Sequence, residues 1–290
     1  MCRLFAMSSG REPANATFWL LQAPDSLSEQ SRREPDGTGL GWFDEHGEAH
    51  VRKQAIAAYE DARFAREART LSSRLFLAHV RFASTGALDV RNTHPFKQDG
   101  RLMAHNGVVQ GLDELERHLG ADMELVHGET DSERLFALIT RETRARGGDV
   151  GAGIAAACTW VAANLPLLAI NQLLADGEEL WMLRYPDTHP LYLMERGAGE
   201  ELEHTSSLGS RVHSEAGAAM GLVLAASEPL DHESGWRLLR SGELIRVDAD
   251  LRVSSHHIID RPPAHPLTLE DLEPRARASQ QHGPAGSGAA

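Results

Sequence analysis

Apolar residues along the chain fall mainly into short runs of strand length, with a few longer stretches at helical spacing. Residues 75–80 form a continuous apolar run, which predicts a strand buried on both faces. Residues 39–43 and 49–52 flank a polar turn, which predicts a hairpin, and the Asp176-Gly177 pair predicts a second one. Further strands are predicted at residues 4–7, 102–105, 167–174, 180–184, 191–194, 221–225, 244–247 and 252–258.

Three segments have the spacing of helices, namely residues 112–119, 131–144 and 151–163. The second of them follows Thr130, which stands three residues before Glu133. This is the S/T-x-x-E relation of a capping box, in which each side chain accepts a hydrogen bond from the backbone of the other residue.

The order of these elements favours a mixed α+β domain with antiparallel sheets. Strands dominate the second half and short turns connect them, whereas a doubly wound parallel fold needs alternating strands and helices. No internal repeat is visible, and we assign residues 2–274 to one domain. From Arg275 on, Ala, Ser, Gln, Gly and Pro replace large apolar residues, which predicts a disordered tail over residues 275–290.

Charge and composition exclude several classes of function. The 290 residues include 29 lysines and arginines against 42 acidic residues, a net charge of −13. Such a surface repels nucleic-acid backbones and acidic membranes, so neither is an expected partner. With 41% hydrophobic and 24% charged residues, the composition is that of a globular protein. Neither a secretory signal nor a membrane-spanning run is visible, and two cysteines are too few for a disulfide scaffold. We therefore expect a cytoplasmic protein.

Cys2 is the first candidate for chemistry because of its place in the chain. Removal of Met1, expected when a small residue follows it, would give Cys2 a free α-amine beside its thiol. An α-amine titrates near ~7.7–8.0 and a thiol near ~8.5, so the amine can take the thiol proton at neutral pH. Nucleophile and base would then share one residue. Alternatively, Cys2 is an inert small residue that follows the start codon.

Two polar positions in the middle of the chain could bind or orient a substrate. Arg81 leaves the end of a buried strand, where its guanidinium could clamp a carboxylate or form a structural ion pair. His94 precedes Pro95, which holds the preceding backbone extended. The His94 ring could orient a hydrogen bond or simply pack.

Two further clusters supply the other groups that amide hydrolysis needs. Asn106 and Gly107 place an amide side chain and an accessible backbone N–H together after a strand, which is the chemistry of an oxyanion hole. Asn-Gly is also a common tight turn. Asp131 lies in the first turn of a predicted helix, where a carboxylate could receive an ammonium group or simply complement the helix dipole.

The joint order of these clusters resembles that of the class II, or N-terminal nucleophile, glutamine amidotransferases. Members include the glutaminase half of glucosamine-6-phosphate synthase and glutamine phosphoribosylpyrophosphate amidotransferase. The resemblance is carried by Cys2 and by RFASTG (81–86), NTHP (92–95), HNG (105–107) and ETDSE (129–133). Three weaker stretches are similar to the small stand-alone glutaminase-domain proteins of the family and extend the resemblance to about Asp248. They are DGTGLGW (36–42), NQLLADG (171–177) and SEPL (227–230).

This resemblance implies a four-layer αββα sandwich of the N-terminal nucleophile hydrolase type, with no cofactor and no metal. It implies that Cys2 attacks the side-chain amide of glutamine and forms a thioester, which water then hydrolyses. In the implied site Asn106 and Gly107 hold the oxyanion, Arg81 binds the α-carboxylate, Asp131 binds the α-ammonium, and Ser84 and His94 are auxiliary glutamine-site residues.

The chain departs from the family pattern at two positions. Thr85 stands where the glucosamine-phosphate synthase type has histidine, and Thr38 stands where the stand-alone proteins usually have tryptophan. The segment after Glu133 is also too short for a sugar isomerase or phosphoribosyltransferase domain. We therefore expect any acceptor of the released ammonia to be a separate synthase.

Three other functions remain open at this point. The same residues could cleave a γ-glutamyl conjugate, as in the related ergothioneine-pathway amidase, or the fold could serve as a binding module without catalysis. A metal hydrolase is suggested by the 15 histidines. They form no H-E-x-x-H pattern, however, and the neighbours His256 and His257 would point to opposite faces of a strand.

Overall fold

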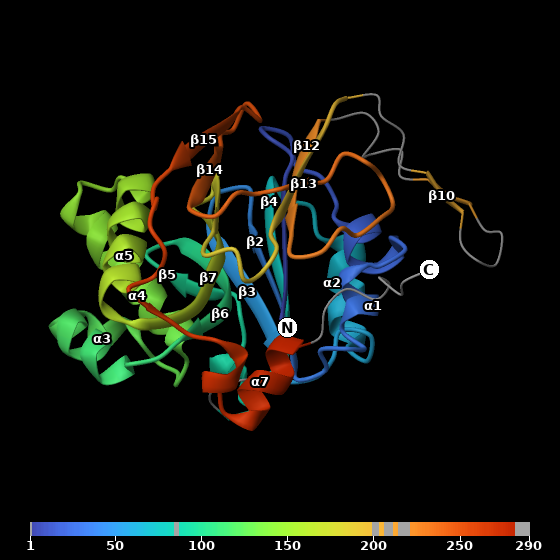
Figure 1. Ribbon diagram of the computed structural model, residues 1–290. Coiled ribbons are helices and arrows are strands. Elements are labelled where there is room, and N and C mark those ends of the chain that lie inside the picture. The colour runs from blue at the N-terminus through green and yellow to red at the C-terminus, as the bar shows by residue number, and fades with distance from the viewer. Residues whose placement is uncertain (1, 84–86, 199–202, 206–210, 214–220, 282–290) are drawn as a thin grey trace.

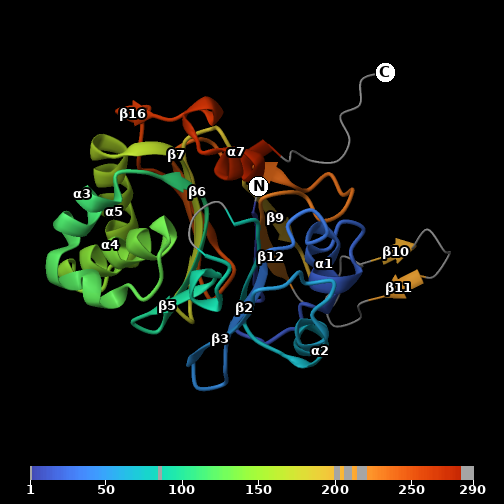
Figure 2. The same cartoon turned by 90° about the horizontal axis from the view of Figure 1, so that it is seen from below.

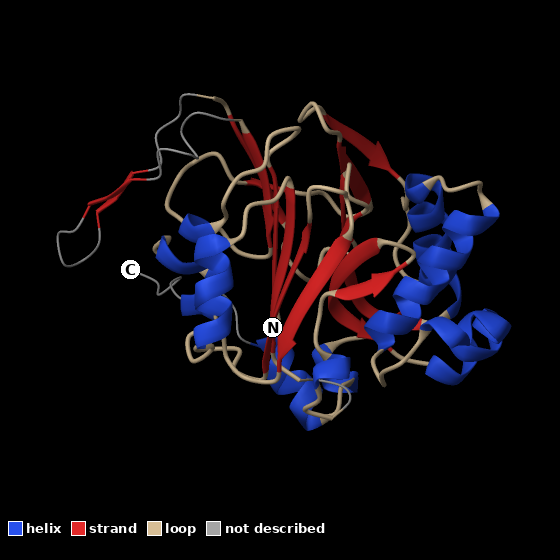
Figure 3. Ribbon diagram, turned by 180° about the vertical axis from the view of Figure 1, so that it is seen from behind, coloured by secondary structure: helices blue, strands red, loops and turns tan. Residues whose placement is uncertain are grey.

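Two antiparallel sheets form the centre of the molecule in the computed structural model, which describes residues 2–83, 87–198, 203–205, 211–213 and 221–281. The sheets stack face to face, and helices cover the outer face of each one (Figure 1, Figure 3). The layer order is helix, sheet, sheet, helix. The predicted α+β fold and its αββα sandwich are confirmed.

The first sheet has the strand order β13-β9-β12-β1-β4-β2-β3. Its central strand β1 is buried along its whole length. Because neighbouring side chains of a strand point to opposite faces, Phe5 and Met7 pack under the helices, whereas Leu4 and Ala6 pack between the sheets. The strands are β1 (Arg3–Ser8), β2 (Gly37–Phe43), β3 (Ala49–Gln54), β4 (Leu75–Arg81), β9 (Tyr192–Arg196), β12 (Leu222–Ala226) and β13 (Arg237–Leu238).

The second sheet has the order β15-β14-β8-β7-β6-β5, and the short β16 pairs with β7 in parallel. Its inner face contributes Leu102, Ala104, Leu173 and Met182 to the core between the sheets. The strands are β5 (Phe96–Gln98), β6 (Arg101–Val109), β7 (Pro166–Ala175), β8 (Leu180–Arg184), β14 (Glu243–Val247), β15 (Val253–His257) and β16 (His265–Pro266). A separate hairpin consists of β10 (Glu203–Thr205) and β11 (Arg211–His213).

Helices α3 (Leu112–Leu119), α4 (Asp131–Ala145) and α5 (Val150–Asn164) cover the second sheet (Figure 1). Within the described ranges, every helix falls short of the length or apolar character that a bilayer crossing requires. On the first sheet lie η1 (Phe18–Gln22), α1 (Leu27–Gln30) and α2 (Ala62–Thr70), and the remaining helical segments are η2 (Val90–Asn92), η3 (Gly120–Leu125), η4 (Leu269–Asp271) and α7 (Pro274–Gln281).

All predicted strands and helices are present, with small shifts at their ends and two informative differences. Strand β6 does not stop at residue 105 but continues through Asn106 and Gly107. The capping box forms only in part. Thr130 accepts a hydrogen bond from the Glu133 N–H, but the Glu133 carboxylate accepts one from the Gly128 N–H instead. Both differences lie beside the candidate site.

The tail predicted to be disordered from residue 275 instead begins with helix α7. Ala276, Ser279 and Gln280 of this helix are buried. Composition misled the prediction because the helix docks through small and polar side chains rather than through large apolar ones. Residues 282–290 lie outside the described part of the chain, and the boundary at residue 274 remains a prediction.

A buried ion-pair network holds the start of β1. The Arg3 side chain is fully buried, and its guanidinium nitrogens lie 3.2 Å from Glu34 Oε1 and 2.8 Å from Glu228 Oε1. The adjacent Leu4 N–H donates to Ser227 Oγ at 3.0 Å. The network therefore ties the first strand to the segments before β2 and after β12.

We expect Arg3→Ala to lower the free energy of unfolding by about 3–5 kcal/mol, because Glu34 and Glu228 would lose a buried partner cation. Chemical denaturation measures this change. Arg11→Ala, which removes an arginine paired with Asp250 on the surface, is the matched control and should leave stability nearly unchanged. Equal small effects of both substitutions would contradict the structural role of Arg3.

Candidate active site

The chain brings most of the predicted site residues to one small cavity. Five of the seven line it, from the residue before β1, the end of β4, the loop before β5, strand β6 and the first turn of α4. Its volume is about 20 Å³, room for about one water. The lining residues are Cys2, Arg81, Phe82, Asn92, His94, His105, Gly107, Thr130, Asp131 and Ser132.

Cys2 is buried directly before β1, and its sulfur meets the backbone at the end of β4. The Cys2 thiol donates to the Phe82 carbonyl at 3.4 Å, and the Phe82 N–H donates to Cys2 Sγ at 3.3 Å. Burial, with a smaller contribution from the negative Glu34, raises the pKa of the Cys2 thiol. The thiol is therefore protonated at neutral pH, and any attack by the thiolate needs a base that takes this proton.

Asn106 and Gly107 belong to strand β6 and lie next to Cys2. The Asn106 side-chain amide donates to the Cys2 carbonyl at 3.0 Å, leaving its second N–H for another acceptor. A Cβ on Gly107 would lie 1.8 Å from the Ala169 carbonyl oxygen, so only glycine lets β6 and β7 approach this closely. The predicted oxyanion pair is thus brought beside the predicted nucleophile, although Asn106 does not line the cavity itself.

Asp131 and Arg81 bring opposite charges to the cavity. Asp131 Oδ2 accepts from the Val109 N–H at 2.8 Å, and Oδ1 accepts from the Ser132 N–H at 2.9 Å. A carboxylate has further acceptor positions beyond these two. Arg81 donates to the Ala87 carbonyl at 3.2 Å, and burial lowers the pKa of its guanidinium, which stays charged at neutral pH. Ser84 lies outside the described residues.

Two buried histidines, His94 and His105, line one wall of the cavity, and a third, His79, packs behind His94. The rings of His79 and His94 lie 4.3 Å apart, and their four nitrogens have no hydrogen-bond partner among the described residues. Burial lowers the pKa of His79 to about 3 and also lowers the pKa values of His94 and His105. His105 Nδ1 lies 2.9 Å from Ser132 Oγ. At neutral pH this wall is polar but uncharged.

The loop that carries His94 lies flat against β2 because alternate residues of that strand are glycines. A Cβ on Gly39 would lie 1.8 Å from the His94 carbonyl oxygen, and one on Gly41 would lie 2.9 Å from Pro95 Cγ. The DGTGLGW stretch therefore supports the site sterically. Thr38 faces away from this loop and donates to the Ile56 carbonyl at 2.8 Å.

Sequence reasoning gave no role to several residues of the site. Asn92 and Glu129 tie two site loops together, because the Glu129 N–H donates to Asn92 Oδ1 at 2.8 Å and Asn92 Nδ2 donates to Glu129 Oε2 at 3.1 Å. Asn92 lies in the NTHP motif and Glu129 in the ETDSE motif, and both motifs were quoted for the roles of other residues. Their position beside those residues was the only signal in the sequence that could have found them. His79, His105 and Ser132 were also given no role, and Thr130 was predicted only as a helix cap.

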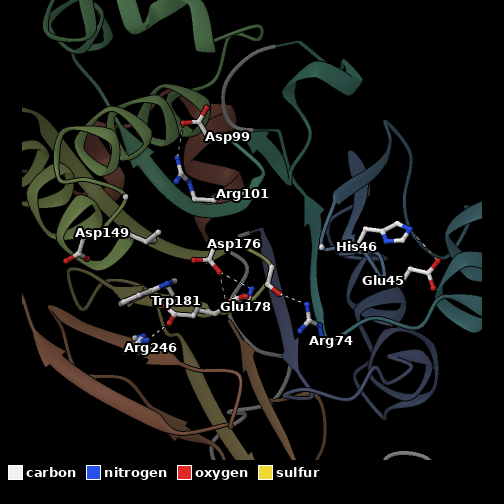
Figure 4. Close-up of a pocket in the computed structure, with 15 residues that line it drawn as sticks. Glu45, His46, Arg74, Asp99, Arg101, Asp149, Asp176, Glu178, Trp181 and Arg246 are labelled. Carbon is white, nitrogen blue, oxygen red and sulfur yellow. Dashed lines mark hydrogen bonds and ion pairs between the residues drawn. The ribbon is translucent and has the colours of Figure 1, made fainter.

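A much larger cavity of about 870 Å³ opens at the other end of the sheets (Figure 4). Arg74, which lines it, precedes β4, whereas Arg81 ends that strand. Charged side chains line this cavity, including Asp99, Asp176 and Arg246. It contains none of the predicted site residues, so the site is recognised by its chemistry and not by size.

One group of side chains in the described ranges has the spacing to hold a metal ion. It consists of Asp44, Glu48 and His50 on the β2–β3 hairpin. Asp44 and His50 already bond each other at 2.9 Å, and this bond is the main reason why the pKa of Asp44 falls to about 2. The hairpin turn lies at the end of β2 away from Cys2.

The comparison that decides the family is a match of residues 1–265 to the model of the class-II glutamine amidotransferases. The chain belongs to this family. A gamma-glutamyl-hercynylcysteine sulfoxide hydrolase of Mycolicibacterium smegmatis is 30% identical to this chain, over 85% of this chain and 96% of the relative. A putative glutamine amidotransferase of Haemophilus influenzae is 23% identical over 72% of each chain.

Other relatives are longer than the chain's matching region. The match spans 63% of a Methanocaldococcus jannaschii protein of uncharacterised function and 20% of the glutamine–fructose-6-phosphate aminotransferase of Bradyrhizobium diazoefficiens.

Solved structures of the family share the fold of this chain. A class-II domain protein from Silicibacter pomeroyi matches 89% of this chain and all of its own, with a TM-score of 0.59 and 22% identity. Glutamine phosphoribosylpyrophosphate amidotransferase from B. subtilis matches over 90% of this chain and 50% of its own, with a TM-score of 0.61 and 18% identity. The N-terminal nucleophile hydrolase fold is thereby shown.

The uncharged histidine wall predicts a loss of stability in acid. Folded His79 stays neutral down to about pH 3, whereas the unfolded side chain takes up a proton near pH ~6.5. The unfolded state therefore binds more protons between these values, and the free energy of unfolding falls as the pH drops from about 6.5 toward 3. The expected contribution of His79 is up to roughly 4 kcal/mol.

Urea denaturation at several pH values measures this dependence. His79→Phe, which keeps a ring but cannot titrate, should flatten the profile in part, because His94 still contributes. His46→Asn, at an exposed histidine, is the control and should retain the full slope. A profile of His79→Phe that coincides with wild type would contradict the assignment.

Proposed function

We propose that this protein is an amidohydrolase that releases ammonia from the side-chain amide of glutamine through a thioester on Cys2. The observation that carries the proposal is the convergence on one cavity of a buried thiol, the Asn106–Gly107 segment and the charged pair Arg81 and Asp131. A module that only binds would not need a nucleophile beside an amide donor and a close backbone N–H.

In the proposed reaction the Cys2 thiol transfers its proton to the α-amine that removal of Met1 exposes. Sulfur attacks the amide carbon, and the new oxyanion accepts hydrogen bonds from Asn106 and the Gly107 N–H. The carbon–nitrogen bond breaks as the protonated amine returns its proton to the leaving ammonia. Water then adds to the thioester, glutamate leaves and the thiol is regenerated.

Arg81 and Asp131 would bind the two charged ends of the amino acid in this reaction. Arg81 would take the α-carboxylate and Asp131 the α-ammonium, with Ser84 and His94 as auxiliary contacts. A buried site with both charges rejects analogues that lack either group, because a site group would be left unpaired. The enzyme would act either on its own, with ammonia as a free product, or together with a separate synthase that accepts the ammonia. We propose that the reaction takes place in the cytoplasm.

A γ-glutamyl conjugate is the second candidate substrate. It is favoured by the Mycolicibacterium smegmatis relative, which is named a gamma-glutamyl-hercynylcysteine sulfoxide hydrolase and is matched over 96% of its length. The nucleophile and the residues that bind the glutamyl part would act in the same way on both substrates. The leaving amine alone would differ.

Replacing Cys2 tests the proposed chemistry. Cys2→Ala should reduce the release of ammonia and glutamate by about a thousandfold or more, because no nucleophile remains to form the thioester. Cys158→Ala is the matched control. That thiol is buried in α5, burial raises its pKa to about 12, and its loss should leave kcat/KM within about twofold of wild type. Equal activity of wild type and Cys2→Ala would refute a Cys2 thioester.

Competing substrates separate the two candidate functions. We expect a higher kcat/KM for glutamine than for γ-glutamylethylamide or γ-glutamylglycine, measured as glutamate release by the same enzyme preparation. Fast cleavage of the conjugates with negligible glutaminase activity would assign the second function. N-terminal mass spectrometry of the preparation establishes whether Met1 has been removed.

A further inference from the structure

Helix α7 lies at the nucleophile end of the sandwich, although it follows the segment that matches the family. The match ends at residue 265, and α7 spans Pro274–Gln281. In two perpendicular views the helix lies next to the N-terminus (Figure 1, Figure 2). The contacts that α7 makes near the site are therefore made by residues outside the segment 1–265 that matches the family.

Two anchors dock α7, one on the second sheet and one on the segment between β8 and β9. Ala276 packs in a small buried cluster with Val108 and Leu168, and Val108 directly follows Gly107 on β6. Gln280 is buried, and its Oε1 accepts a hydrogen bond from His189 Nε2 at 2.7 Å. These contacts hold the helix at its third and seventh residues.

The first turn of α7 reaches the first sheet through Arg275. Its guanidinium lies 3.6 Å from Asp36 Oδ2, just before β2. The same oxygen accepts from the Ala83 N–H at 2.9 Å, and the Asp36 N–H donates to the Arg81 carbonyl at 2.9 Å. Asp36 thus holds both ends of residues 81–83.

The held tripeptide contains the groups on which the site depends. Its first residue, Arg81, lines the cavity, and both backbone groups of its middle residue, Phe82, contact Cys2 Sγ. A shift of residues 81–83 would therefore move the cation and the polar neighbours of the sulfur together. The charge of Arg275 also acts on Arg81, since it contributes to lowering the pKa of that guanidinium.

We propose that Arg275 is a positioning residue that acts through Asp36 on residues 81–83. This inference rests on the proposed function insofar as Arg81 binds substrate. Arg275 keeps the Asp36 carboxylate turned toward the Ala83 N–H and thereby holds Arg81 in place for an α-carboxylate. The Arg275 side chain is 58% exposed, so the effect of its loss is several-fold rather than complete.

Kinetics and hydrogen exchange on the full-length protein test this role. Arg275→Ala should raise KM for glutamine about threefold to fivefold and leave kcat within about twofold, because substrate binding is affected more than the chemical step. The Ala83 amide should exchange at least about threefold faster. Arg275→Lys should restore most of both values. In the Asp36→Asn background, Arg275→Ala should cause little further change in KM or in the exchange of the Ala83 amide, because Asp36 no longer links Arg275 to residues 81–83.

Arg11→Ala is the control, since it removes another exposed arginine–aspartate pair at the far end of β1, 2.8 Å from Asp250. It should change neither KM nor the exchange of the Ala83 amide. Unchanged exchange at Ala83 in Arg275→Ala would overturn the proposal, whatever the enzyme hydrolyses. A different outcome separates the two proposals. If the wild-type enzyme cleaves neither glutamine nor γ-glutamyl conjugates, but the Ala83 amide exchanges faster in Arg275→Ala, the proposed function is overturned and the positioning role of Arg275 is retained.

Discussion

The position of Cys2, the proposed nucleophile, depends on the burial of strand β1. Cys2 directly precedes a strand whose six residues are all buried and which pairs with β4 on one side and β12 on the other. A strand held on both edges and packed on both faces has no freedom to slide, because a shift by one residue would turn every side chain to the wrong face. The rigid centre of the fold therefore fixes a residue at its very edge.

The same burial sets the chemical character of the site. Removing the thiol and the nearby imidazoles from water favours their neutral forms, so the cavity combines a protonated sulfur with an uncharged histidine wall. Arg81 and Asp131 are the charged groups among the residues that line it. In such surroundings, hydrogen-bond donors that are already oriented stabilise a developing negative charge more strongly than they would in water.

Much of the fold could be predicted from the sequence, because its strands and main helices have clear apolar periodicity. Five of the seven predicted site residues line one cavity. Cys2, Arg81 and Asp131 lie next to strand or helix ends that the pattern located, whereas Gly107 lies inside β6 beyond its predicted end and His94 precedes β5, which was not predicted. The helix α7 could not be predicted, because its burial depends on Gln280 and Ala276 fitting a surface made by distant residues. The capping box predicted for Thr130 and Glu133 forms only in part for a similar reason, because the Gly128 N–H donates to the Glu133 carboxylate.

The contact between Arg275 and Asp36 also has a consequence for the order in which the molecule is made. Asp36 belongs to the first part of the chain to leave the ribosome, and Arg275 is synthesised only near the end. The sheets can pair earlier, as domains generally begin to fold during synthesis. With the proposed role of Arg275, the support beneath Arg81 is completed only when α7 docks, so a nascent chain that already contains Cys2 still has an unfinished candidate site.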